Sequence, residues 1–191
     1  MDCIDCKAKS CRKGGKTRIC EINKEKTISE YKNEENQKIV QNAAILVDNG
    51  RAGTLSRIQE LLEFIRLMKY QKIGLAYCYG LENLVSQLLP VFRKTGAEVV
   101  PVSCTFGGLL QDEVNQESRI HNVSCNPLSQ AEKLNQEKVE LTIVIGLCLG
   151  HDILLNRYLK SDVTTLLVKD RTASHDVMKG ISKLFLELNR Q

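Results

Sequence analysis

The sequence contains no apolar run of the roughly 18 to 20 residues that would cross a lipid bilayer. Its first residues, Met1 to Lys7, also lack the apolar segment of a secretory signal peptide. The 191 residues, of which 42% are hydrophobic and 26% charged, suit one soluble globular domain with a small appendage. We therefore expect a cytoplasmic protein with no membrane partner.

Several common motifs of nucleotide-binding proteins and hydrolases are missing as well. The sequence has no Gly-x4-Gly-Lys-Ser/Thr phosphate loop, and no Gly-x-Gly-x-x-Gly follows the first expected strand. It also has no His-Glu-x-x-His zinc motif and no Gly-x-Ser-x-Gly nucleophile turn. The common nucleotide-binding and hydrolase chemistries are therefore unsupported.

Excess positive charge is confined to residues 1–26, where eight Lys or Arg residues face four acidic ones. This local difference equals the net charge of +4 of the whole chain. No aromatic residue is interleaved there to stack on bases, as nucleic-acid binding would favour. We interpret the cations as balancing metal-bound thiolates, and we expect no nucleic-acid partner.

The chain has eight cysteines, which in a reducing compartment are metal ligands or redox groups more naturally than disulfides. Four of them form the pattern Cys3-x2-Cys6-x4-Cys11-x8-Cys20 in a segment with almost no apolar residues. Such a segment cannot fold by burying a core, whereas a structural metal supplies about 10–16 kcal/mol of folding free energy. We predict a metal-binding knuckle over residues 1–26, and its spacing suits zinc or an iron-sulfur cluster.

Residues 27–191 show the pattern of a second, α/β domain. Leading helices are expected over 28–47 and from an N-cap at Thr54. Short apolar runs then alternate with helical segments: strands at 73–77, 98–102, 141–145 and 163–168, and helices at 81–95, 127–137, 149–159 and 176–189. This alternation predicts a parallel sheet of about four strands covered on both faces, a three-layer flavodoxin-like or Rossmann-like fold. Residues 105–124 do not fit the rhythm, and loops of that length are usually functional or disordered.

The other four cysteines are placed by these expected strands. Cys78, Cys104 and Cys148 follow three of them, and Cys125 precedes Pro127, the expected first residue of a helix. Because the carboxyl ends of parallel strands share one edge, all four thiols should converge where open α/β sheets bind ligands. We predict a shared metal site there and favour an iron-sulfur cluster, of the 4Fe-4S type, over zinc. The alternative is that these cysteines are buried as small hydrophobic residues.

Charged and imidazole groups lie close to the same edge in sequence. His151 follows Cys148 by three residues and suits either a helix cap or a ligand, and Asp152 is its neighbour. Lys169, Arg171 and His175 follow the last expected strand, where a substrate or partner would dock. We expect these five residues to contact the cysteines or a substrate.

Three sequence segments carry a family resemblance. They are Cys3-x2-Cys6-x4-Cys11, Cys125-Asn126-Pro127-Leu128-Ser129-Gln130-Ala131 and Gly146-Leu147-Cys148-Leu149-Gly150-His151-Asp152. Together they resemble the bacterial family called domain of unknown function 1847, found mostly in anaerobes, over nearly the full length. Similar proteins are often labelled metal-binding because of the same cysteines, so the resemblance implies no substrate or reaction. An anaerobic setting would suit oxygen-sensitive clusters.

The leading hypothesis is an iron-sulfur redox protein, either an electron carrier or a cluster-dependent redox enzyme. Its partner would be a redox protein or a small-molecule substrate. One rival is a zinc knuckle attached to an α/β binding module with no redox activity. Another is a thiol enzyme that uses Cys78 or Cys148 as a nucleophile at a helix N-terminus. The sequence leaves open which applies, whether the protein is an enzyme, and its oligomeric state.

Overall fold

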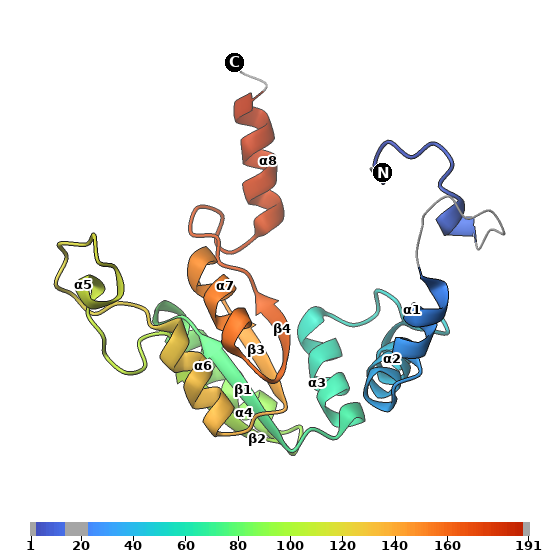
Figure 1. Cartoon of the computed structure of the whole chain (residues 1–191), viewed down its shortest axis with the longest axis horizontal. Coiled ribbons are helices and arrows are strands. Elements are labelled where there is room, and N and C mark those ends of the chain that lie inside the picture. The colour runs from blue at the N-terminus through green and yellow to red at the C-terminus, as the bar shows by residue number, and fades with distance from the viewer. Residues whose placement is uncertain (1–2, 14–22, 189–191) are drawn as a thin grey trace. The chain divides into compact units, whose positions relative to one another are not determined.

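The structure is a computed structural model that describes residues 3–13 and 23–188. The chain divides into two compact units, Met1–Ile45 and Leu46–Gln191 (Figure 1). Within the described residues, no helix combines the length and the apolar character that crossing a bilayer requires.

The first unit is built from short, mostly exposed helical segments. It contains the 3-10 helix η1 (Ser10–Lys13), the helix α1 (Lys24–Tyr31) and most of α2 (Glu34–Val47). The single helix predicted over 28–47 is wrong, because the Asn33 side chain accepts hydrogen bonds from the backbone of Glu35 and starts a new helix there. Helix α1 buries none of its residues.

The second unit contains a four-stranded parallel sheet. Its strands are β1 (Lys72–Tyr77), β2 (Glu98–Ser103), β3 (Leu141–Ile145) and β4 (Asp162–Leu167), in the order β2-β1-β3-β4. Each lies within one residue of its predicted bounds. The order is that of the first four strands of flavodoxin-like sheets, so the predicted three-layer α/β fold is confirmed.

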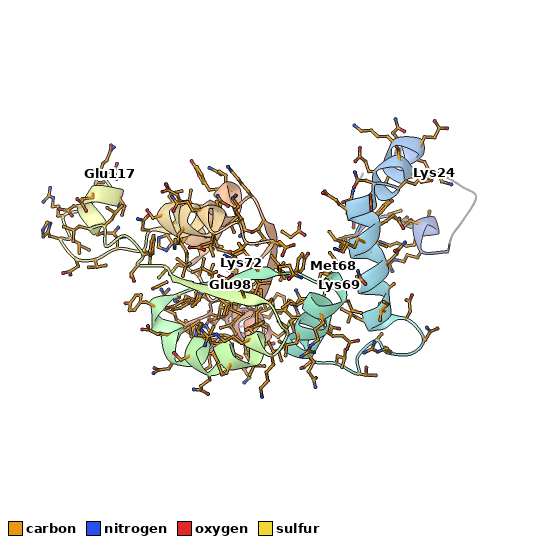
Figure 2. All side chains as sticks on the ribbon, turned by 90° about the horizontal axis from the view of Figure 1, so that it is seen from below. Lys24, Met68, Lys69, Lys72, Glu98 and Glu117 are labelled. Carbon is orange, nitrogen blue, oxygen red and sulfur yellow. The ribbon has the colours of Figure 1, made fainter. Side chains whose placement is uncertain are left out.

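Helices cover both faces of this sheet. The elements that follow the strands are η2 (Tyr79–Leu81), α4 (Glu82–Arg93), α6 (Pro127–Gln136), α7 (Leu149–Tyr158) and α8 (Val177–Leu188), of which α8 buries none of its residues and extends away from the sheet (Figure 1). Helices α6 and α7 lie side by side on one face and α4 lies on the other (Figures 1 and 2). Right-handed crossovers explain this placement. The connection from β1 to β2 runs across the sheet in one direction, whereas the connections from β2 to β3 and from β3 to β4 run in the opposite direction.

Two connecting regions differ from the sequence expectation. Helix α3 (Arg57–Met68) begins after Ser56, whose backbone N–H donates to the Gln59 side chain, so the predicted N-cap at Thr54 is wrong. Thr54 instead donates its hydroxyl to the carbonyl of Arg51. The long connection over 105–124 forms the short helix α5 (Gln111–Val114) and an antiparallel bridge between Leu110 and Val123.

A buried amide fastens α6 to the strands that carry two of the cysteines. Gln130 is fully buried, and its Nε2 donates to the carbonyl oxygens of Val102 at 2.7 Å and Tyr77 at 3.3 Å. Both acceptors lie at the carboxyl ends of their strands, just before Cys104 and Cys78. Gln130 therefore holds the ends of β1 and β2 at a fixed position relative to α6.

We expect Gln130→Leu to lower the free energy of unfolding by about 1–3 kcal/mol, because the buried carbonyl of Val102 loses its side-chain donor. Gln136→Leu is the matched control, since Gln136 is exposed on the same helix and its replacement should change stability by less than about 0.5 kcal/mol. Urea unfolding measures both. Equal effects of the two substitutions would show that Gln130 does not anchor the strands.

Candidate functional site

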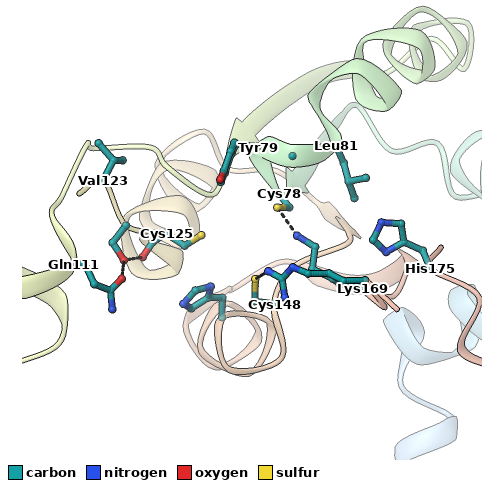
Figure 3. A pocket seen from close by; sticks show the side chains of 13 residues that line it. Cys78, Tyr79, Leu81, Gln111, Val123, Cys125, Cys148, Lys169 and His175 are labelled. Atoms are coloured by element: carbon teal, nitrogen blue, oxygen red, sulfur yellow. Dashed lines mark hydrogen bonds between the residues drawn. The ribbon is translucent and has the colours of Figure 1, made fainter. Parts of the chain in front are cut away.

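The strand ends of the second unit enclose a pocket at the point where the strand order reverses. Cys78 follows β1 directly and Cys148 follows β3, and the helices after these strands lie on opposite faces of the sheet. Such a reversal opens a crevice in α/β proteins. The pocket has a volume of about 490 Å³ and is lined by Cys78, Tyr79, Gly80, Leu81, Gln111, Val123, Ser124, Cys125, Cys148, His151, Lys169, Arg171 and His175 (Figure 3).

All four predicted domain cysteines lie at this end of the sheet. Cys78, Cys125 and Cys148 line the pocket, whereas Cys104 is only 1% exposed and lies beneath it. The Cys104 sulfur is 3.4 Å from that of Cys125, so the fourth thiol touches one of the other three. Across residues 3–13 and 23–188, however, no three Cys, His, Asp or Glu side chains are grouped closely enough to hold a single metal ion.

Cys78 is paired with a lysine from the end of β4. The Nζ of Lys169 donates to the Cys78 sulfur at 2.6 Å, and the Gly80 backbone also donates to this sulfur. Burial raises the pKa of the Cys78 thiol, but the lysine and the amide outweigh it, and the pKa falls below its ordinary value. The thiolate form of Cys78 is therefore stabilised relative to that of an ordinary cysteine.

Cys148 has a similar partner, because the Arg171 guanidinium donates to its sulfur at 3.0 Å. That hydrogen bond raises the pKa of Arg171 above its ordinary value. Cys148 is also the N-cap residue of α7, where the helix dipole presents partial positive charge. Two positive features thus surround one sulfur atom.

The remaining two thiols are held differently. Burial raises the pKa of Cys104 to about 12, although the Tyr79 backbone N–H donates to its sulfur at 3.3 Å. Burial also raises the pKa of Cys125, and the nearby sulfurs of Cys148 and Cys78 add to that effect. The site therefore combines two thiols paired with cations and two thiols that contact each other and have raised pKa values.

The predicted neighbouring residues are divided between the pocket and its surroundings. His151 and His175 line the pocket, together with Lys169 and Arg171. The Nδ1 atom of His151 is buried without a hydrogen-bond partner among the described residues, and burial together with the two cations lowers its pKa. Asp152 instead accepts a hydrogen bond from Asn156 on α7.

The N-terminal cysteines belong to the first unit. Cys3 and Cys11 are exposed and Cys6 is half-buried. Lys9 donates its Nζ to the backbone carbonyls of Cys3 and Ile4. Cys20 lies outside the described residues, so the four-cysteine knuckle stays a prediction.

Some residues of the site carried no recognisable sequence signal. The backbone amides of Tyr79 and Gly80 bind sulfur, a property that side-chain identity does not reveal. Ser124 and Gln111 come from the long connection, where the Ser124 hydroxyl donates to the Gln111 side chain at 2.7 Å. The unusual length of that connection was the only hint that it contributes to the pocket.

Comparison with known proteins identifies a family without a described activity. The family model described as Protein of unknown function (DUF1847) matches residues 15–166, a range that includes all four pocket cysteines. The chain is 38% identical to the uncharacterized protein MJ0455 of Methanocaldococcus jannaschii over 194 residues, covering 98% of this chain and 97% of the relative. No solved structure matches.

We expect Lys169→Met to raise the pKa of Cys78, because its main thiolate partner is removed while the burial stays. In metal-free protein, the Cys78 thiol of the variant should then ionise at a higher pH than that of the unmodified protein. Ultraviolet thiolate absorbance, taken as the difference from a Cys78→Ser background, measures this. The exposed Lys160→Met is the control; an unchanged titration in Lys169→Met would contradict the pairing.

Proposed function

We propose that this chain, which belongs to the DUF1847 family, is an iron-sulfur redox protein whose domain cluster is held by Cys78, Cys104, Cys125 and Cys148. The observation that carries the proposal is the meeting of thiols from four separate chain segments at one pocket, with basic side chains in contact with two of them. Its activity would be electron transfer or cluster-dependent redox chemistry.

The separation of the thiols favours a cluster over a single ion, although four cysteines can also hold zinc. Iron-sulfur clusters are held by cysteine thiolates, and the potential ligands here are four sulfurs. A tetrahedral zinc ion with Zn–S distances of about 2.3 Å would need all four sulfurs close together. The thiols are not gathered in that way in the described chain, and the pocket that three of them line has a volume of about 490 Å³.

The charges around the pocket support the same assignment. A cluster held by four thiolates is anionic, and the Lys169 and Arg171 side chains would compensate that charge. The Tyr79 and Gly80 amides donate to sulfur, which stabilises thiolates and raises the reduction potential of such a centre. When bound, the cluster would supply one-electron transfer. The buried position of Cys104 would keep water from that side of the site.

The basic wall of the pocket indicates how a partner would approach. Lys169 and Arg171 line it, so an anionic small molecule or an acidic surface of a redox partner protein would be attracted there. A separate metal, either zinc or a cluster, would be held by Cys3, Cys6, Cys11 and Cys20. We place the protein in the reducing cytoplasm. The competing function is a zinc knuckle joined to a binding module without redox activity.

We expect anaerobically purified protein to contain iron and acid-labile sulfide and to show visible charge-transfer absorption. Cys148→Ala should abolish the signal of the domain cluster, because one ligand and the partner of Arg171 are lost. Cys11→Ala is the control and should leave that signal intact, since Cys11 belongs to the other unit.

Metal analysis and visible spectroscopy measure both variants. A colourless, iron-free protein that carries one zinc would contradict the proposal and favour the non-redox module. Identical losses in the two variants would instead mean that one site is shared by both units.

A further inference from the structure

We propose that Cys104 and Cys125 form a reversible disulfide, and that they are a thiol-disulfide exchange site reached through the pocket. Their sulfurs are 3.4 Å apart, so closure to a disulfide of about 2.05 Å requires the sulfurs to approach by about 1.4 Å. The backbones are already adjacent, because the N–H of Asn126 donates to the carbonyl of Cys104 at 2.6 Å. The two sulfurs therefore need to move only a short distance to form the bond.

The surroundings single out this pair among the four thiols. Lys169 and Arg171 hold the sulfurs of Cys78 and Cys148, whereas Cys104 and Cys125 contact each other. Breaking either cation pair would leave a charged group without its partner. Oxidation of Cys104 with Cys125 leaves both cation pairs intact.

The two thiols also differ in their access to solvent. Cys125 lines the pocket, whereas Cys104 is 1% exposed beneath it. An external oxidant therefore reaches Cys125 first. Cys104 then acts as the resolving thiol, protected from direct attack by solutes.

The oxidant that this arrangement suits is a disulfide, either of a small thiol compound or of a protein dithiol. Cys125 first gives its proton to solvent in the pocket, and the resulting thiolate attacks one sulfur of that disulfide, whose S–S bond breaks and releases one thiolate that takes up a proton. Cys104 then attacks the Cys125 sulfur, the bond between Cys125 and the external sulfur breaks, and the proton of Cys104 passes to the departing sulfur, which leaves as the second thiol. Two protein thiols are thereby oxidised by two electrons, and the external disulfide is reduced to two thiols.

The disulfide would tether both ends of the connection over residues 105–124, which contributes Gln111, Val123 and Ser124 to the pocket. If the proposed cluster is present, the same bond would remove two of its four ligands. The pair would then couple the loading of the cluster to the thiol redox state, a consequence that rests on the proposed function. The exchange itself requires no cluster.

The test uses metal-free, fully reduced, full-length protein equilibrated with buffers of increasing glutathione disulfide content. Acid quenching, alkylation of free thiols and peptide mass spectrometry then identify each linkage. We expect the peptides of Cys104 and Cys125 to become joined while Cys78 and Cys148 are alkylated. Two results would overturn the proposal. One is that Cys125 becomes linked mainly to Cys78 or Cys148, and the other is that Cys104 and Cys125 stay reduced in glutathione disulfide without reductant.

Two variants test whether Cys125 reacts with the external disulfide before Cys104 does. Cys104→Ser should abolish the internal disulfide and trap Cys125 as a mixed disulfide with glutathione, whereas Cys148→Ser should leave the Cys104–Cys125 linkage unchanged. Absence of the mixed disulfide in folded Cys104→Ser protein, checked by circular dichroism, would exclude Cys125 as the entry thiol. Iron and sulfide content of separately purified protein reports on the cluster, so either idea can fail without the other.

Discussion

Parallel pairing of β1 with both β2 and β3 is the constraint on which the whole site depends. The register aligns Tyr77 with Ser103 on one side and with Ile145 on the other. The ladder continues past the strands, because the N–H of Cys104 donates to the carbonyl of Tyr77 and the N–H of Cys78 to that of Ile145. A slip of one residue would turn every side chain of the shifted strand to the opposite face and separate the sulfurs.

Charge balance is the second requirement, because several thiols gathered at one pocket disfavour ionisation in the absence of cations. In the segment after β4, two side chains from alternate positions point toward the sulfurs, and both are cations. Lys169 and Arg171 contact sulfurs, while the carboxylate of the intervening Asp170 accepts hydrogen bonds from the backbone of Thr172 and Ala173. A compact turn thus directs two positive groups to the pocket and uses the negative one to stabilise itself.

The sequence was sufficient for the sheet because continuous apolar runs and their spacing determine parallel strands, and strand ends determine where Cys78 and Cys148 lie. It was insufficient for contacts that depend on rotamers and distant segments, such as the pairing of Lys169 with Cys78 across 91 residues. Local side-chain hydrogen bonds also start two helices at residues other than those that the apolar pattern predicts. Asn33 caps a new helix inside an otherwise helical pattern, and Ser56 with Gln59 starts α3 in place of Thr54.

The central claim is that four sulfurs from separate segments ligate one cluster. Iron-edge X-ray absorption, on full-length protein in which Cys3, Cys6, Cys11 and Cys20 are all replaced by serine, tests it most directly. We expect anaerobically reconstituted protein to retain iron whose nearest neighbours are only sulfur and iron. Iron with oxygen or nitrogen neighbours from the protein, or no bound iron at all, would contradict it.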